Sequence, residues 1–319
     1  MLIRCCVFLS GGVLLIAAGA ACGQDYPTKP VRVVTVALGG GTDLSARIIA
    51  PLISASLGQQ VIVDNRGGGT IAIDTVARAA PDGYTLLWYG SPLWLTPLLR
   101  NTVTFNYERD FLPITLATTA PYFFYVHPSL PVKSVKELIA LAKARPGEIN
   151  YGSAGSGTTT HLSAELFKSK AGVDITRILY KGGGPAANAL LAGEVQMMFT
   201  TGSTGVAQVK AGKLKVLAIT SAQPSALAPG VPTMAASGVQ GSEITQIVGM
   251  FAPARTPAPV INRLNQEIVR VLNRPDIKEK LFSLGLEAVG SSPEQLAAAV
   301  KSEIVSMGKV IKDAGIRDE

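Results

Sequence analysis

Small hydroxyl residues and glycines gather between residues 150 and 172, where the sequence predicts that a strand leads into a helix. Residues 150–152 end the expected strand, residues 153–157 form a loop, and the helix begins at 158–160 and ends at Gly172. The first backbone N–H groups of such a helix have no intrahelical partner, and the positive end of the helix dipole lies behind them. Glycine also lets the backbone approach a ligand closely. The stretch therefore predicts a site for an anion such as a carboxylate.

The hydroxyl groups of this loop allow other interpretations. The candidate donors are Ser153, Ser156, Thr158 and Thr159. A phosphate-binding P-loop needs Lys after its second glycine, where this chain has Thr158, and the serines lack the flanking glycines of a nucleophile elbow. A hydrolase that pairs Ser153 or Ser156 with His161 is one alternative, although a base five residues further into the helix aligns poorly with Ser156. The other alternative is an ordinary turn whose hydroxyls only cap the helix.

Two more glycine loops precede expected helices, at residues 39–43 and 181–185. Pro185 follows three glycines and marks a helix start with unpaired N–H groups. If these loops face the loop at 153–157, an anion could be held between helix N-termini. Asp43 could instead be a partner of the helix dipole, and Lys181 could be a solvated side chain. The candidate ligand-binding residues of the two loops are Gly40, Gly41, Thr42, Asp43, Lys181, Gly182 and Gly183.

Apolar strand patterns alternate with amphipathic helical patterns from Tyr26 onward, which predicts an α/β fold with parallel sheets and helices on both faces. We expect two lobes, with the second inserted into the first and the chain crossing near residues 122–126 and 248–251. The expected division is 1–23 signal peptide, 24–122 and 250–319 first lobe, and 123–249 second lobe. The expected strands are 31–37, 61–65, 81–90, 122–128, 150–152, 175–180, 195–200, 215–220 and 249–254; the expected helices include 44–57, 134–147, 158–172, 185–192, 262–273 and 293–314.

Ligands bind beyond the carboxyl ends of the strands in such sheets. Aromatic side chains lie near the end of the strand expected over 81–90, where Trp88, Tyr89 and Trp94 could stack on a ligand ring or cover the core instead. The further candidate ligand-binding residues at strand ends are Trp88, Gly90, Ser91 and Thr200.

The N-terminus has the pattern of a secretory signal, because an apolar run over 7–18 follows Arg4 and small residues come next. Cleavage after Gly23 would give a soluble exported chain; a lipid anchor on Cys22 is the alternative. All three cysteines lie in or beside this signal and the chain has two histidines, so we expect neither a metal nor a cofactor. The formal charge of +7 comes without Lys/Arg runs, which argues against a nucleic-acid partner.

Several segments, in the same order, resemble the Bug (TctC-like) family of periplasmic solute-binding proteins, the binding component of tripartite tricarboxylate transporters. They include YPTKPVRVV, APDGYTLL, YGSAGSGTTTHLSAELF, YKGGGPA, GEVQMMF, KAGKLKVLAIT and FAPARTP. The resemblance implies a two-lobe type II periplasmic binding protein, the Venus flytrap fold, with the ligand in a cleft between the lobes. Residues 40–43 stand in the family's first ligand loop, and Ser153, Ala154, Gly157, Thr158 and Thr159 stand in its second. Thr200 replaces the acidic residue that the family often has there.

The expected protein is therefore an exported, non-catalytic binding protein. We expect a monomer that captures a small carboxylate, such as a di- or tricarboxylate or an aromatic acid, and delivers it to the membrane permease subunits of a tripartite transporter. The resemblance also permits a sensory role, in which the liganded protein docks on a membrane receptor kinase.

Overall fold

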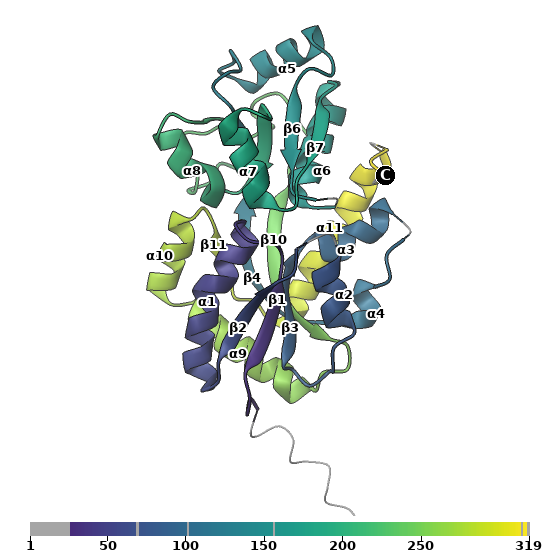
Figure 1. The fold of residues 1–319 in the computed structure, drawn as a ribbon, viewed down its shortest axis with the longest axis vertical. Coiled ribbons are helices and arrows are strands. Elements are labelled where there is room, and N and C mark those ends of the chain that lie inside the picture. Colours follow the sequence, from purple (N-terminus) through teal and green to yellow (C-terminus); the bar gives the residue numbers. More distant parts are fainter. Residues whose placement is uncertain (1–25, 68–69, 101, 156, 314, 318–319) are drawn as a thin grey trace, which may run out of the picture.

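The computed structural model describes residues 26–67, 70–100, 102–155, 157–313 and 315–317. These residues form two α/β lobes stacked along the long axis of the molecule, as expected (Figure 1). The expected signal peptide at 1–23 lies outside the described residues. Within these ranges, no helix is both long and apolar enough to cross a membrane.

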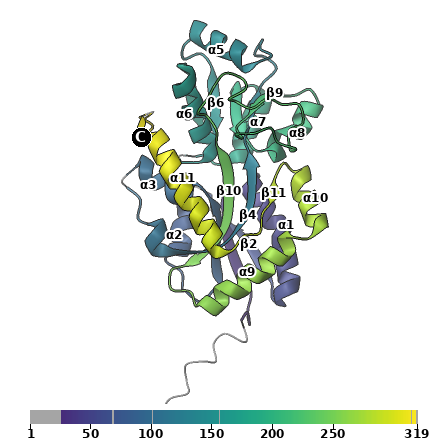
Figure 2. The same cartoon turned by 180° about the vertical axis from the view of Figure 1, so that it is seen from behind.

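The first lobe is built on a six-stranded sheet in the order β11-β4-β10-β3-β1-β2. Helices α1 and α9 pack on one face of this sheet, and α2, α3 and α11 pack on the other (Figures 1 and 2). Its strands are β1 (Val31–Thr35), β2 (Val61–Asn65), β3 (Thr85–Gly90), β4 (Phe111–Pro121), β10 (Thr245–Pro253) and β11 (Glu287–Ala288); its helices are α1 (Gly41–Leu57), α2 (Ile71–Ala77), α3 (Pro92–Leu99), α4 (Tyr107–Asp110), α9 (Ala258–Leu272), α10 (Pro275–Ser283) and α11 (Pro293–Asp313).

The second lobe is built on a five-stranded sheet in the order β7-β6-β8-β5-β9. Helices α5 and α6 contribute to the core on one face, and α7 and α8 to the core on the other. Its strands are β5 (Phe123–Val126), β6 (Asn150–Ser153), β7 (Thr176–Leu179), β8 (Met197–Thr200) and β9 (Lys215–Ile219); its helices are α5 (Val135–Ala144), α6 (Thr159–Ala171), α7 (Gly183–Ala192) and α8 (Gly202–Lys210).

Both sheets are mixed, where the sequence predicts parallel sheets. Strand β1 pairs in parallel with β2 and β3, and β6 with β7 and β8, but β10 runs antiparallel to β3 and β4, and β5 runs antiparallel to β8 and β9. The antiparallel strands β4, β5 and β10 adjoin the places where the chain passes between the lobes. These strands are not joined to their neighbours by β-α-β crossovers, the connection that places two strands in parallel, so they can pair antiparallel.

The two crossings lie at Tyr122 and Ile244. Tyr122 stands between β4 in the first sheet and β5 in the second, and β10 belongs to the first sheet along its whole length. The expected boundary between residues 249 and 250 falls inside β10, so we place it before Thr245. Thr220 ties the crossings together, because its hydroxyl accepts from Tyr122 N at 2.8 Å and donates to Ile244 O at 2.6 Å.

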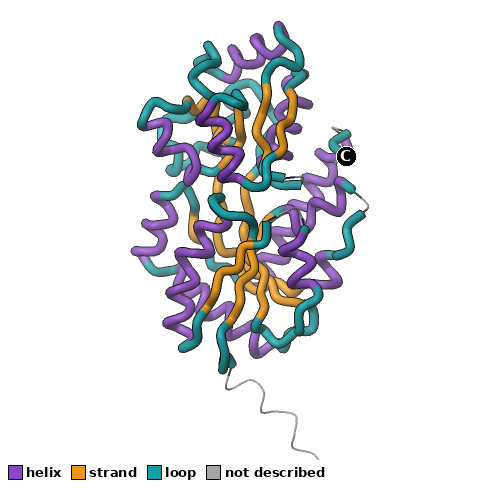
Figure 3. The backbone as a smooth tube through the Cα atoms, viewed as in Figure 1, coloured by secondary structure: helices purple, strands orange, loops and turns teal. Residues whose placement is uncertain are grey.

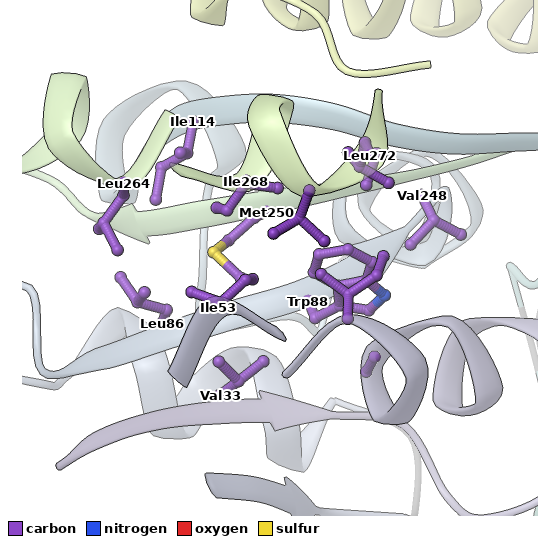
Figure 4. Packing of buried hydrophobic residues seen from close by; sticks show 14 of the residues in the cluster. Val33, Ile53, Leu86, Trp88, Ile114, Val248, Met250, Leu264, Ile268 and Leu272 are labelled. Atoms are coloured by element: carbon purple, nitrogen blue, oxygen red, sulfur yellow. The ribbon is translucent and has the colours of Figure 1, made fainter. Parts of the chain in front are cut away.

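The core of the first lobe holds the strands that lead to the region between the lobes. Val33, Leu86, Trp88 and Met250 project from neighbouring strands against α1 and α9 (Figure 4). Each is at most 2% exposed. Each Å² of apolar surface removed from water contributes about 25 cal/mol to stability, so the burial of these side chains holds the strands and their ends in place.

Candidate functional site

A cavity of ≈ 460 Å³ lies between the lobes, where the carboxyl ends of the parallel strands meet. Loops from both lobes gather there (Figure 3). Twelve of the sixteen candidate residues line this cavity, which brings together positions as far apart in sequence as Gly40 and Thr200. The twelve are Gly40, Gly41, Thr42, Gly90, Ser91, Ala154, Thr158, Thr159, Lys181, Gly182, Gly183 and Thr200.

The start of α6 forms one wall of the cavity. Thr158 is the N-cap residue, in extended conformation, and its hydroxyl accepts from His161 N at 3.3 Å and donates to Gly155 O at 2.6 Å. The expected capping role of Thr158 and the lining of the cavity are thus compatible, because the cap fixes the loop while the first turn of α6 faces the cavity. Gly172 ends the helix in the left-handed conformation, as predicted.

The starts of α1 and α7 meet across the cleft. A Cβ atom built on Gly184 would lie 3.2 Å from the carbonyl oxygen of Leu38, and one built on Gly39 would lie 3.3 Å from the Cα atom of Gly184. Backbone therefore lies close to backbone between the lobes, and a side chain at either position would require its neighbour to shift by a few tenths of an ångström. The lobes are closed on each other along this side, with the N-termini of both helices beside the cavity.

Asp43 is buried beneath the cavity and does not line it. Its carboxylate accepts from Gly39 N at 3.1 Å, from Arg47 Nε at 3.0 Å and from Asn65 Nδ2 at 2.7 Å. These bonds hold the glycine loop 39–43 against the end of β2. Asp43 therefore holds the loop in place, and its position in the first turn of α1 also agrees with the alternative of a partner for the helix dipole.

Trp88 does not reach the cavity, which corrects its place among the candidates. Its side chain lies in the core of the first lobe, and its Nε1 donates to Ser45 Oγ at 3.1 Å. Successive residues of a strand point to opposite faces of a sheet, so Tyr89 lines the cavity instead. Trp94 is also buried, where it packs on Phe251.

Ser153 and Gly157 are buried and lie outside the cavity lining, which includes Ala154 and Thr158 beside them. Ser153 Oγ accepts from Arg177 Nε at 3.2 Å. Gly157 packs on α3 of the opposite lobe, since a Cβ atom at this residue would lie 2.7 Å from Thr96 Oγ1. Both residues thus support the loop from behind.

His161 is a buried neutral side chain. Desolvation lowers its pKa to about 3, and the positive charges of Arg177 and Lys168 act in the same direction. Its Nδ1 accepts from Gly157 N at 3.4 Å. In the part of the chain that the structure describes, His161 pairs with Gly157 and Ser153 with Arg177, so the Ser153–His161 pair that the hydrolase alternative requires is not formed; Ser156 lies outside the described residues.

The floor of the cavity is formed by residues that no sequence motif predicts. Tyr122 and Gln246 lie on the two crossings, are buried, and are joined by a bond from Gln246 Nε2 to Tyr122 Oη at 3.2 Å. Nothing in the local pattern of either segment indicates a ligand, because their proximity depends on the return of the chain from the second lobe. The other missed lining residues deep in the cleft are Thr96, Thr160, Thr201 and Ile247.

The missed residues nearer the entrance carry positive charge and apolar surface. Arg66 and Lys181 line the cavity with exposed side chains, and Leu179 is 61% exposed. Arg66 directly follows strand β2, so the rule that ligands bind beyond strand ends could have identified it. Further lining residues here are Gly67, Thr70, Arg100, Gly155 and Tyr180.

Residues 45–316 match the family described as tripartite tricarboxylate transporter family receptor. The chain is similar to the UPF0065 protein in the tcbD-tcbE intergenic region of Pseudomonas sp. (strain P51), with 37% identity over 90% of this chain and 86% of the relative. It is also similar to protein BugT of Bordetella pertussis, with 33% identity over 96% of both chains. The latter confirms the resemblance to the Bug family.

Solved structures confirm the fold. R. palustris Rpa4515 with adipate has a TM-score of 0.89 and 35% identity, covering 92% of this chain and 99% of the other. MatC from Rhodopseudomonas palustris with bound malate has a TM-score of 0.86 and 31% identity, covering 90% and 100%. The family and these neighbouring structures are substrate-binding proteins, not enzymes. The chain belongs to the tripartite tricarboxylate transporter receptor family, as its sequence motifs predict.

Proposed function

We propose that this protein captures a small carboxylate outside the cytoplasm and presents it to the permease subunits of a tripartite transporter. The observation that carries the proposal is the cavity between the lobes, where the N-termini of α1, α6 and α7 lie beside the lining residues. Helix N-termini favour negative charge, each by about 0.3–1 kcal/mol, and hydrogen bonds to a carboxylate add about 1.5–3 kcal/mol each. A few such bonds reach the roughly 8 kcal/mol of micromolar binding.

The lining also favours a ligand with an apolar body. Val36, Pro92, Leu179 and Ile247 contribute apolar surface between the buried floor and the entrance. A dicarboxylate fits this arrangement, with one carboxylate near the hydroxyls of Ser91 and Thr159 and the other near Arg66 or Lys181 at the entrance. The neighbours solved with adipate and with malate, both dicarboxylates, support this class.

The proposal includes export by a signal peptide at 1–23. The mature protein is a monomer. The family's periplasmic place is consistent with export, since a related solved structure is the periplasmic binding protein BugD. A closed cleft brings surfaces of both lobes side by side, which gives a permease a means to recognise the liganded form. Mass spectrometry of the exported protein tests the cleavage after Gly23 against lipidation of Cys22.

A thermal-shift screen of residues 24–319 tests the ligand class. The panel contains mono-, di- and tricarboxylates together with their amides. A ligand that binds the native state stabilises it by RT ln(1 + [L]/Kd), about 2.7 kcal/mol at 100 Kd. We expect a dicarboxylate, but not its diamide, to raise the unfolding temperature.

A matched pair of variants locates the binding site. Thr159→Val removes one lining hydroxyl without changing the shape of the side chain, and should weaken carboxylate binding about tenfold. Thr176→Val makes the same change on exposed strand β7 and should not weaken it. Stabilisation by uncharged analogues alone would contradict the proposal.

A further inference from the structure

Helix α11 places a buried carboxylate behind the wall of the cavity. Glu303 is 8% exposed and does not line the cavity. Ser91 Oγ donates to its Oε1 at 2.7 Å, and Trp94 Nε1 donates to its Oε2 at 3.1 Å. Both donors belong to the start of α3, so Glu303 is held on the first lobe at the point where that helix faces the ligand site.

Ser91 connects this carboxylate to the cavity and to the second lobe. Its side chain is buried, lines the cavity, and accepts from Thr159 Oγ1 at 3.4 Å. Thr159 lies in the first turn of α6, and the next residues of α6 reach into the first lobe, where Leu162 is part of the core around α3 and α11. A chain of hydrogen bonds therefore runs across the cleft from the Thr159 hydroxyl through the Ser91 hydroxyl to the Glu303 carboxylate.

The direction of this chain decides what the cavity offers to a ligand. A serine hydroxyl has one proton and two lone pairs. When Ser91 donates to Glu303 and accepts from Thr159, it can offer a ligand only its remaining lone pair. A lone pair suits a hydrogen-bond donor on the ligand and repels a carboxylate.

We propose that Glu303 is a positioning residue that sets the direction of the Ser91 hydroxyl, so that a ligand carboxylate binds together with a proton taken up by Glu303. A protonated Glu303 can donate to Ser91 Oγ, and the Ser91 proton is then released toward the cavity. The proposal rests on the proposed function, because it requires a carboxylate in this cavity. It goes further by making the binding proton-linked.

The environment of Glu303 supports a proton at physiological pH. Burial raises the pKa of this carboxyl to about 7, against the opposing effect of the bonds from Ser91 and Trp94. Tyr122, at the end of β4, faces it, and burial raises the pKa of the Tyr122 hydroxyl, which therefore stays neutral. His161 of α6 is neutral because its pKa is lowered to about 3, and Arg100, at the end of α3, lines the cavity. A bound anion adds negative charge nearby, which raises the pKa of Glu303 further.

Carboxylate affinity should decrease as pH rises. Glu303 is ionised well above pH 7 and must take up a proton when the carboxylate binds. The affinity then falls as pH rises above the pKa of Glu303, by up to tenfold per pH unit. Glu303→Gln mimics the protonated acid, since its amide can donate to Ser91 and accept from Trp94. Its affinity should not depend on pH in this range.

Titration calorimetry between pH 6.5 and 8.5 tests the proposal, with adipate and malate as probes. Measurements in two buffers of different ionisation enthalpy count the protons taken up on binding. We expect the wild type to take up close to one proton at pH 8 and to bind about tenfold more weakly at pH 8.5 than at pH 7. Glu303→Gln should take up none. This proton count in the wild type does not depend on the folding of any variant.

Two further variants separate positioning from simple charge repulsion. In a Ser91→Ala background, Glu303→Gln should improve affinity much less than in the presence of Ser91, because the hydroxyl that it directs is gone. Glu267→Gln removes another buried glutamate, far along α9 and paired with Arg263 and Arg270, and should keep the wild-type pH profile.

Different outcomes test the role of Glu303 and the proposed function. Binding of either acid without proton uptake, at an affinity independent of pH, overturns the role of Glu303 and leaves the proposed function standing. An equal effect of Glu303→Gln with and without Ser91 overturns the positioning role. Failure of the wild type and of Glu303→Gln to bind any carboxylate overturns both.

Discussion

His161 and Glu303 should give the unfolding free energy opposite dependences on pH. Burial lowers the pKa of His161 from 6.5 to about 3, so the folded protein excludes a proton that the unfolded chain accepts. Burial raises the pKa of Glu303 from 4.5 to about 7, so the folded protein keeps a proton that the unfolded chain releases. The two groups lie on different lobes, on helices α6 and α11.

The magnitudes follow from about 1.4 kcal/mol for each unit of pKa difference. As pH falls from 6.5 to 4.5, the unfolded chain protonates His161 and the folded protein does not, which lowers the unfolding free energy by about 3 kcal/mol. As pH falls from 7 to 4.5, the folded protein protonates Glu303 before the unfolded chain does, which raises the unfolding free energy by about 3 kcal/mol. In the wild type the two effects nearly offset each other.

Single variants should separate the two contributions to the pH dependence of the unfolding free energy. Between pH 7 and 4.5, Glu303→Gln should lose about 3 kcal/mol of unfolding free energy relative to the wild-type change, because only the His161 effect remains. His161→Asn should gain about 3 kcal/mol over the same range, because only the Glu303 effect remains. The double variant should recover the wild-type slope. Urea unfolding followed by far-ultraviolet circular dichroism at half-unit steps of pH measures all four profiles.

Matched controls are available in the same chain. His127→Asn removes the other histidine of the described residues, which lies near the surface beside Ser129, and Glu267→Gln removes a second buried glutamate. Both should keep the wild-type profile. The reasoning is refuted if Glu303→Gln and His161→Asn both follow the wild type between pH 7 and 4.5, since burial would then not separate the folded and unfolded pKa values.

Two local changes give further tests. Gly184→Val should press a side chain against Leu38 and hold the lobes further apart, which lowers carboxylate affinity about tenfold in a binding assay and expands the radius of gyration in small-angle scattering. The control Gly308→Val in α11 should change neither the affinity nor the radius. Ser134→Ala should cost about 1 kcal/mol of unfolding free energy in urea, because Ser134 accepts from Glu137 N as the N-cap of α5; unchanged stability would count against this cap.

The sequence predicted the features that depend on neighbouring residues. The turn from β6 into α6 and the turn from β7 into α7 are local patterns of glycine, hydroxyl residues and proline, and residues of both line the cavity. Strand β2 was predicted with its exact ends, and β1 and β6 to within two residues. These segments could be predicted because the physical reason for each structure lies within one short window.

Strand β4 could not be predicted from its neighbouring residues. Its residues Phe111–Pro121 include Pro113 and several threonines, and the pairing with β10 has two register shifts. The strand exists because β10, more than 120 residues further along, pairs with almost its full length. The missed floor residues Tyr122 and Gln246 have the same origin, since each is placed by the crossing beside it.

The origin of each contact also indicates what it can control. Where the lobes meet at Gly39 and Gly184, backbone packs on backbone, so these positions should hardly distinguish one acid from another. The side chains that vary in charge and shape come from the crossings and from the entrance, where Tyr122, Gln246 and Arg66 line the cavity. Glycine loops can be shared by proteins that bind different acids. The choice of acid should therefore change with Tyr122, Gln246 and Arg66, which sequence motifs alone did not identify.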